Sequence, residues 1–225
     1  MFDAEVVELN AQGAKDALRS FPTSKSKSLR AKIFGLVKRS GDFLAAILLL
    51  PLTLIAGLAL LGLNPFFNKG PLLYRQVRMG KDCVPFTAYK FRSMTEAAPV
   101  KRGAFDELEE HRITKLGRLM RKSRVDELPQ IWNILKGDMS LVGPRPDFID
   151  HARVYLTRIP GYRERYNVRP GVTGLAQTEV GYVSDEAGFR RKVAADLLYI
   201  RKMGFTYDLK VMARTVQIVL GQRGR

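Results

Sequence analysis

The hydrophobic pattern is dominated by one run of 21 uncharged, almost wholly apolar residues, from Phe43 to Leu63. A helix needs about 20 such residues to span a bilayer. The segment before the run is basic and carries Lys25, Lys27, Arg30, Lys32, Lys38 and Arg39. A basic segment directly before an apolar one is typical of chain that meets anionic lipid. Nucleic acid is the alternative partner for the basic segment alone, and a buried core helix is the soluble alternative for the run.

A proline inside the run decides how we expect it to meet a membrane. Pro51 removes one helix hydrogen bond and favours a break in the membrane helix. Basic residues flank both ends of the run, and such flanks favour the cytoplasmic side. We therefore expect a re-entrant helix–break–helix that enters and leaves one leaflet, in preference to a spanning helix. Thr53 or neighbouring protein would have to satisfy the backbone exposed at the bend.

Shorter patterns fill the rest of the chain. Two strand-like pieces, Leu72–Val77 and Pro85–Phe91, flank a turn at Gly80–Asp82 and predict a β-hairpin. Helical spacing of apolar residues predicts further helices over Phe105–Arg124 with an interruption near His111, over Leu128–Leu135, over Glu186–Met203 and over 209–220.

The pattern as a whole predicts an α+β, mostly helical fold. We expect an N-terminal re-entrant membrane helix and a small cytosolic domain with a short β-hairpin and amphipathic interfacial helices. The expected boundaries are a flexible basic N-terminal tail over residues 1–32, the membrane helix-hairpin over 33–64 and the cytosolic domain over 65–225.

Charge narrows the choice of partner. The 225 residues include 38 Lys and Arg against 22 Asp and Glu, a formal net charge of +16. Such an excess favours an anionic partner, whether nucleic acid, lipid headgroups or a phosphorylated substrate. Cys83 is the single cysteine, which excludes an intrachain disulfide. His111 and His151 have no cysteine or histidine at ligand spacing, which argues against a structural zinc site.

Asp126 and Glu127 are adjacent carboxylates among the cations Arg118, Arg121, Lys122 and Arg124. They precede the apolar segment Leu128–Leu135, and Pro129 fits the first turn of a helix. Asp126 would then lie at a helix N-terminus, where the dipole and free N–H groups favour anions. An ionised carboxylate beside a phosphate held by arginines is a workable arrangement for phosphoryl transfer. The alternative is an N-capping Asp in a surface salt-bridge patch, because capping is a common use of Asp.

Further cations occupy rigid turns or one strand face. Arg145 lies between two prolines, and Arg169 is followed by Pro170 and a glycine. Arginine suits bidentate phosphate binding, so both are candidates for it. Lys90 and Arg92 share one face of a strand by the period of two. A solvated surface cation is the alternative in each case. The glycine spacings match neither a Walker nor a Rossmann motif.

Five motifs in order along the chain resemble those of the bacterial sugar transferases, the monotopic polyprenol-phosphate phosphoglycosyl transferases. The matching motifs are Lys38-Arg39, Tyr89-Lys-Phe-Arg-Ser-Met94, Asp126-Glu-Leu-Pro-Gln130, Lys136-Gly-Asp-Met-Ser-Leu-Val-Gly-Pro-Arg-Pro146 and Val168-Arg-Pro-Gly-Val-Thr-Gly-Leu-Ala-Gln177. The resemblance covers about residues 33–220.

The resemblance implies a catalytic phosphoglycosyl transferase domain. A nucleotide sugar, expected to be a UDP-sugar, would give its sugar-1-phosphate to undecaprenyl phosphate and release UMP. In such enzymes the Asp of the pair, here Asp126, is the nucleophile that forms an aspartyl-phosphosugar intermediate, and the Glu, here Glu127, holds Mg²⁺. Positions expected to contact phosphate are matched by Lys90, Arg121 and Arg145, with Arg92 and Arg169 as weaker candidates.

The resemblance also implies a setting and partners. The enzyme would lie at the cytoplasmic face of the bacterial inner membrane and carry out the first membrane step of exopolysaccharide, capsule, O-antigen or glycoprotein glycan assembly. Its expected partners are the nucleotide-sugar donor, undecaprenyl phosphate and anionic membrane lipid, with no nucleic acid. A homodimer through the tail or the C-terminal helix is compatible with the sequence.

Two departures from the family pattern matter. Leu50-Pro51 stands where many relatives have Ser-Pro, and Thr178–Gly181 stands where many have an Asn-Gly-Arg stretch. The second departure leaves the sugar unassigned and makes that segment a candidate specificity element. Two other functions stay open. One is a basic membrane-anchored binding protein without chemistry, and the other is a metal-dependent phosphatase that needs no nucleotide donor.

Overall fold

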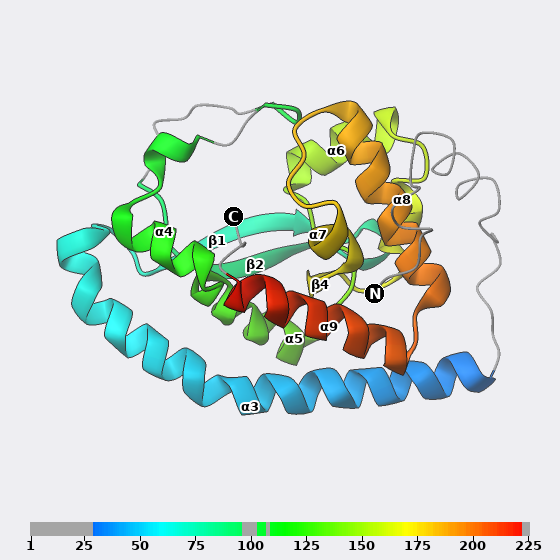
Figure 1. The fold of residues 1–225 in the computed structure, drawn as a ribbon, viewed down its shortest axis with the longest axis horizontal. Coiled ribbons are helices and arrows are strands. Elements are labelled where there is room, and N and C mark those ends of the chain that lie inside the picture. The colour runs from blue at the N-terminus through cyan, green and yellow to red at the C-terminus, as the bar shows by residue number, and fades with distance from the viewer. Residues whose placement is uncertain (1–28, 96–102, 107–108, 222–225) are drawn as a thin grey trace.

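The computed structural model describes residues 29–95, 103–106 and 109–221 (Figure 1). The predicted N-terminal tail therefore lies almost wholly outside the described residues. Within them, one long helix runs along a small domain of shorter helices and two two-stranded sheets. The predicted mostly helical α+β class with a β-hairpin is confirmed.

The apolar run forms part of α3, a single α-helix over Leu29–Phe67 with Pro51 inside it. The helix break that we expected at Pro51 is therefore wrong. Figure 1 shows a continuous helix that bends toward the domain at the end leading into the hairpin. A proline removes one hydrogen bond and can kink a helix without ending it. Thr53 Oγ1 donates to the Leu49 carbonyl at 3.0 Å, a back-bond that also bends helices.

The first half of α3 is held to the domain by polar side chains. Lys38 Nζ lies 2.5 Å from Asp208 Oδ2. Arg39 donates to the carbonyl oxygens of Ile134 and Leu135 at 2.6 and 3.0 Å. One turn further on, the buried Asp42 accepts a hydrogen bond from the Leu141 amide at 3.0 Å. The Lys38-Arg39 pair, which we expected at the lipid, is used inside the protein.

The second half of α3 contacts the same domain. Asn64 and Asn68 are buried, and their side-chain amides donate to the carbonyls of Gly70 and Arg92, each at 2.6 Å. Leu60 packs in a small core with Phe91 and Met120. Both ends of the helix are thus fixed to one body of protein.

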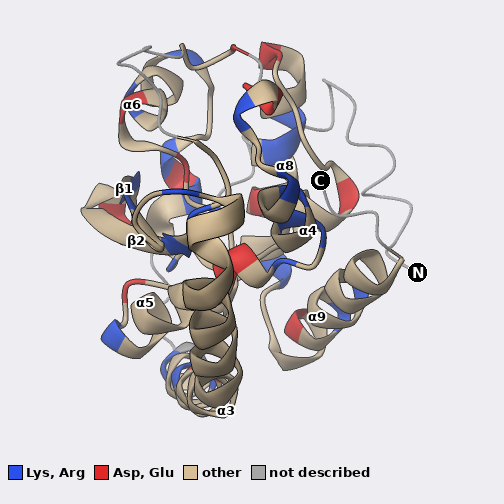
Figure 2. Ribbon diagram, turned by 90° about the vertical axis from the view of Figure 1, so that its left-hand side faces the viewer, with Lys and Arg blue, Asp and Glu red and all other residues tan. Residues whose placement is uncertain are grey.

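The face of α3 between these contacts is apolar and exposed. Leu48 is 79% exposed and Leu58 is 71% exposed. Lys32–Phe67 is long and apolar enough to cross a membrane, and only 11% of its most apolar window is buried. Figure 2 shows α3 tan along most of its visible length. This exposure separates α3 from the core helix of a soluble protein.

The predicted hairpin is confirmed. Strand β1, Leu73–Met79, pairs antiparallel with β2, Pro85–Phe91, through the short 3-10 helix η1, Lys81–Cys83. A second sheet was not predicted. It consists of β3, Ser140–Val142, and β4, Gly171–Thr173, which pair in parallel.

The predicted helices before and after Asp126 are shorter than expected. In the described part of the segment Phe105–Arg124, the helices are the 3-10 helix η2, Glu110–Arg112, and α4, Lys115–Lys122. Thr114 begins α4 by accepting from the Gly117 amide. The next segment is the 3-10 helix η3, Val125–Gln130, followed by α5, Ile131–Lys136, which ends at Gly137 with φ of 94°.

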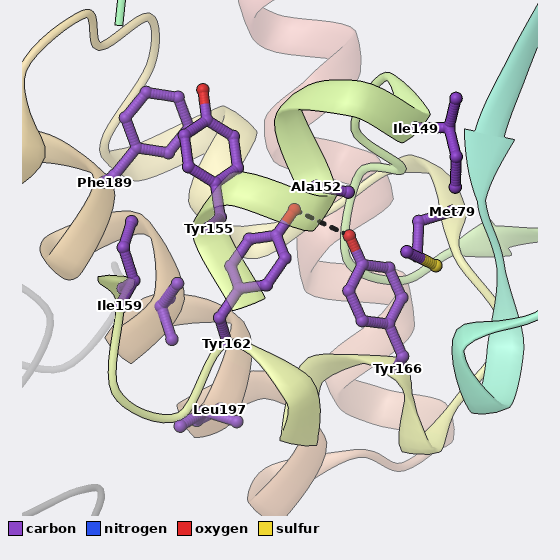
Figure 3. Packing of buried hydrophobic residues seen from close by; sticks show 10 residues of the cluster. Met79, Ile149, Ala152, Tyr155, Ile159, Tyr162, Tyr166, Phe189 and Leu197 are labelled. Carbon is purple, nitrogen blue, oxygen red and sulfur yellow. Dashed lines mark hydrogen bonds between the residues drawn. The ribbon is translucent and has the colours of Figure 1, made fainter. Parts of the chain in front are cut away.

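The rest of the domain is built around an aromatic core. The elements are α6, Ile149–Arg158; η4, Arg163–Asn167; α7, Leu175–Glu179; α8, Glu186–Lys202; and α9, Phe205–Leu220. Figure 3 shows Tyr155 beside Phe189, and a hydrogen bond joining the Tyr162 and Tyr166 hydroxyls at 2.7 Å. This core supports the turn that carries Arg145.

Candidate active site

Asp126 and Glu127 lie in the first turn of η3, and each is only 5% exposed. Arg124, immediately before η3, has φ of 59°. That left-handed conformation is uncommon for a residue other than glycine and is often found at functional sites. The carboxylates are therefore buried groups of the domain, not capping groups in an exposed salt-bridge patch.

Glu127 is held by cations from three other parts of the chain. Its Oε1 accepts from Lys90 Nζ at 2.7 Å and also from Arg145 Nη2. Its Oε2 accepts from Arg145 Nη1 at 3.2 Å and lies 3.8 Å from Arg124 Nη1. Arg145 thus grips the carboxylate with both arms of its guanidinium, the strongest form of this pairing.

The two carboxyl groups have opposite pKa shifts. Burial alone would raise the pKa of Glu127, but Arg145 and Lys90 outweigh burial and hold that pKa well below its usual value. Burial and the neighbouring Glu127 raise the pKa of Asp126, while Lys90 and Arg121 oppose the rise. Opposite shifts in adjacent acids are typical of catalytic sites. Asp126 Oδ1 is buried and has no hydrogen-bond partner among the described residues.

Lys90 and Arg121 are basic side chains whose pKa values are lowered. Burial lowers the pKa of Lys90 from 10.5 to about 8, with Arg145 and Arg78 adding to the effect and Glu127 opposing it. Burial also lowers the pKa of Arg121, against the attraction of Asp126. A phosphate that bound nearby would raise the pKa of both side chains, because a negative charge stabilises their protonated forms.

The sequence motifs that form this site match a known family over most of the chain. The family model described as bacterial sugar transferase matches residues 33–222. The chain belongs to the bacterial sugar transferase family. The resemblance seen in the motifs is thereby confirmed.

Three members of the family are 38–42% identical to this chain. A UDP-N-acetylgalactosamine-undecaprenyl-phosphate N-acetylgalactosaminephosphotransferase of Aeromonas hydrophila is 38% identical over 85% of this chain and 45% of that protein. A UDP-glucose:undecaprenyl-phosphate glucose-1-phosphate transferase of Caulobacter vibrioides is 42% identical over 81% of this chain and 69% of that protein. An uncharacterised sugar transferase of Bacillus subtilis is 39% identical, and the match covers 84% of this chain and 90% of that one. The chain thus spans less than half of the first relative.

In this sugar transferase the predicted site residues fall into two groups. Lys90 from β2, Arg121 from α4 and Arg145 from the turn after β3 surround the two carboxylates. Arg92 and Arg169 make other contacts. The Arg92 guanidinium lies against Gly70, and Arg169 Nε donates to the Gly137 carbonyl at 2.8 Å. Pro51 lies in α3, away from these cations along the chain.

Two residues that the sequence did not single out position this group. Asn133 is fully buried on α5, and its amide accepts from the Tyr89 amide and donates to the Thr87 carbonyl at 3.2 and 2.7 Å. It therefore fixes the free edge of β2 beside Lys90. Arg165 is 1% exposed and donates to the Arg145 carbonyl at 2.9 Å, which fixes the backbone of the arginine turn.

Arg165 is itself part of a buried charge network. It pairs with Asp147 and with Asp196, the latter at 2.7 Å. Lys192 Nζ lies 3.0 Å from Asp147 Oδ1 and completes a set of two acids and two bases. Paired buried charges cost much less than single ones. The partners of Arg165 lie 18 and 31 residues away in sequence, so no local signal could have found this network.

The magnesium ion that the family implies fits the carboxylates. No group of three or more His, Cys, Asp or Glu side chains forms a metal cluster in the described part of the chain. However, Mg²⁺ keeps several waters and often takes one or two carboxylates plus substrate phosphates. Among the described residues, Asp126 Oδ1 has no donor, and Glu127 Oε2 accepts from Arg145 and lies near the more distant Arg124.

Proposed function

We propose that this chain transfers a sugar-1-phosphate from a UDP-sugar to undecaprenyl phosphate and releases UMP, as the initiating membrane step of surface-glycan assembly. The observation that carries this proposal is the pair of buried carboxylates. One, Glu127, is neutralised by Lys90 and Arg145, and the other, Asp126, keeps an oxygen without a donor. The activities named for the Aeromonas and Caulobacter relatives support the same reaction class.

The reaction proceeds in two displacements at one phosphorus atom. An ionised Asp126 oxygen attacks the phosphorus that bears the sugar, and the bond to the oxygen of the UMP phosphate breaks with UMP as leaving group. The product is an aspartyl-phosphosugar. A phosphate oxygen of undecaprenyl phosphate then attacks the same phosphorus, and the bond to Asp126 breaks. The carboxylate is regenerated and undecaprenyl-diphosphate-sugar leaves.

The neighbouring residues have separate parts in this scheme. Lys90, Arg121 and Arg145 offset negative charge so that one anion approaches another. Glu127 keeps Lys90 and Arg145 in place until the donor diphosphate arrives. When bound, Mg²⁺ would be held by Glu127 beside Asp126 and would offset charge on the diphosphate. Asp126 Oδ1, which is buried and has no hydrogen-bond partner among the described residues, keeps its lone pairs for phosphorus.

The same proposal places α3 in one leaflet of the inner membrane, with the domain at the cytoplasmic face. Support comes from Lys38 in the first half of the helix and Leu60 in the second half, because both contact the domain. A helix whose two halves contact one water-facing body enters and leaves on the same side. Anionic headgroups would meet the basic flanks of the helix.

The test measures UMP release and covalent labelling. Purified protein is incubated with undecaprenyl phosphate, Mg²⁺ and a panel of UDP-sugars that carry a labelled β-phosphate. We expect release with one or a few donors, and labelled protein when the lipid is omitted. Asp126→Asn should lose both signals, while Asp150→Asn, an exposed acid on α6, should keep them. EDTA should stop turnover and Mg²⁺ should restore it. Labelling retained in Asp126→Asn would remove Asp126 as the nucleophile, and turnover in EDTA would remove the metal.

A further inference from the structure

A cavity of about 570 Å³ lies between α7 and α9, outside the carboxylate group. Its lining comes from residues 177–181, which form the end of α7 and the loop after it, and from the C-terminal half of α9, including Arg214 and Gln217. The volume lies in the range of ligand pockets. The lining includes the segment Thr178–Gly181, where the sequence departs from the family pattern.

Two buried acceptor atoms of this lining have no hydrogen-bond partner among the described residues. They are Gln177 Oε1 and Glu179 Oε1. The amide nitrogen of Gln177 is used, because it donates to the Val172 carbonyl at 3.0 Å and so fixes the side chain. Glu179 Oε1 lies 3.4 Å from Arg214 Nε, which is an ion pair without a hydrogen bond. Buried acceptors of this kind cost free energy until a donor reaches them.

A short piece of backbone connects the lining of the cavity to the turn that carries Arg145. Gly174 begins α7 and lies against Gly143, so closely that a Cβ on Gly174 would come 2.2 Å from the Gly143 carbonyl oxygen. The Gly143 amide in turn donates to the Thr173 carbonyl at 2.9 Å. Arg145, which grips Glu127, is two residues beyond Gly143. Gln177 is thus one helical turn from the contact that anchors the arginine turn.

We infer that this cavity binds the sugar ring of the nucleotide-sugar donor and that Glu179, with Gln177, recognises its hydroxyl or acetamido N–H groups. The inference rests on the proposed function, because it assumes that the sugar-bearing phosphate lies at Asp126. A sugar ring carries donors on several carbons, which suits a site with two unpaired acceptors. Arg214 supplies the opposite polarity, since its guanidinium donates to ring or hydroxyl oxygens.

This assignment gives the Thr178–Gly181 departure a physical meaning. A site that hydrogen-bonds a hydroxyl rejects an analogue in which that hydroxyl is missing or points elsewhere, because its own buried groups are left unpaired. Glu179 and Gln177 are therefore specificity-determining residues for the donor, distinct from the residues that handle phosphate.

The experiment compares binding of UDP-sugars with binding of UDP alone. Full-length wild-type protein, Glu179→Gln and Glu179→Ala are titrated calorimetrically with UDP, UDP-glucose and UDP-N-acetylgalactosamine. The control is Glu186→Gln, which removes the same charge from an exposed ion pair on α8. We expect both Glu179 variants to lose about 10- to 100-fold in affinity for the preferred UDP-sugar, as for loss of a hydrogen bond to a charged group. Affinity for UDP should stay at the wild-type value.

The outcomes separate this inference from the proposed function. An equal loss for UDP and UDP-sugar would overturn it, because the effect would then lie at the nucleotide or in the fold. Unchanged UDP-sugar affinity in both Glu179 variants, or no preference of the wild type for a UDP-sugar over UDP, would also overturn it. If the wild type turns over and the Glu179 variants bind UDP-sugars as the wild type does, the proposed function stands and the sugar site is wrong. If binding is selective for a UDP-sugar but no donor is turned over, the sugar site stands and the proposed function is wrong.

Discussion

Lys90 is a residue of the candidate site whose charge is expected to change close to neutral pH. Its pKa is lowered to about 8 by burial and by neighbouring arginines. Loss of its proton removes one positive charge from the surroundings of Glu127 and of the donor diphosphate. We therefore expect kcat/KM for the donor to fall as the pH rises through about 8, since this constant reports the free enzyme. Lys90→Arg should move the fall to higher pH, because an arginine stays charged.

The pH profile has an internal control in kcat. A bound diphosphate stabilises the ammonium form, so the alkaline fall in kcat should lie above that in kcat/KM. Lys136→Arg is the matched substitution, on an exposed side chain that contacts the Tyr89 hydroxyl and ring. It should leave the profile where it is. A kcat/KM that stays flat to pH 10 in the wild type would contradict the assignment to Lys90.

The sequence predicted the chemical residues of the site better than their supports. Asp126, Glu127, Lys90 and Arg145 belong to short motifs whose residue types point to anion chemistry by themselves. Asn133 gave no such signal, because an asparagine in an apolar helix acquires its role only when α5 packs against the edge of β2. The same holds for Arg165, which acts through partners more than a dozen residues away in sequence. Arg92 and Arg169 were predicted from local sequence but contact other groups. Strand period and turn chemistry do not determine which groups the end of a long side chain contacts.

At the scale of elements, the attachment of α3 to α9 is the least expected feature. Lys38 pairs with Asp208, and the Tyr199 hydroxyl donates to the other oxygen of Asp208 at 2.7 Å. The same hydroxyl reaches the Val142 carbonyl at 3.1 Å, on the strand that leads to Arg145. The cluster thus connects α3 to the arginine turn. Under the proposed placement of α3 in the membrane, it would keep the site at a constant height above the membrane.

A double-mutant cycle tests this attachment. Lys38→Met and Asp208→Asn each remove one charge, and both partners are largely buried, so each variant leaves a charge without its partner. We expect a coupling free energy of about 0.5–3 kcal/mol between the two positions in thermal unfolding. Lys32→Met with Asp208→Asn is the matched control and should be additive, because Lys32 is exposed. Additivity of the Lys38 pair would show that the contact does not hold the helices together.

Element boundaries were predicted well where one turn signal decided them and poorly where several competed. The hairpin has the expected strands because Gly80–Asp82 turns the chain, and α5 ends at Gly137 as a left-handed glycine requires. The segment Phe105–Arg124 was predicted as a helix with an interruption near His111. Thr114 starts a new helix after that interruption, and Ile113 pairs with Met94 as an isolated bridge. Here a tertiary contact outweighed helical periodicity.

At the scale of the whole molecule, the contacts between α3 and the domain limit the ways in which α3 could enter a membrane. The proline predicted a break, yet the helix continues with a bend. Support for the proposed re-entrant path therefore comes from the contacts that both halves of the helix make with the domain, not from a break in its backbone. The net charge of +16 and the exposed apolar face of α3 fit a surface that meets anionic lipid. A homodimer stays a prediction.

Cysteine labelling tests the topology. Cys83 is the single cysteine, so a Cys83→Ser background accepts one reporter at a time. Lys32→Cys and Lys69→Cys place exposed reporters at opposite ends of α3, and Leu58→Cys places one on its apolar face. With a membrane-impermeant maleimide, both end reporters should label in inverted inner-membrane vesicles and neither in intact spheroplasts.

Each other pattern of labelling has a definite meaning. The Leu58→Cys reporter should stay unlabelled in both preparations until detergent is added, because hydrocarbon excludes the charged reagent. Labelling of Lys32→Cys in spheroplasts, with Lys69→Cys labelled only in inverted vesicles, would show a spanning helix. That result would require the ion pair between Lys38 and Asp208 to be broken in the membrane, since Asp208 would lie with the domain on the opposite side. Labelling of all three reporters in inverted vesicles would instead place α3 on the membrane surface. Under the proposed function, a helix embedded from one side keeps its contacts with the domain and holds Asp126 near the face where a polyprenyl phosphate headgroup would meet a water-soluble donor.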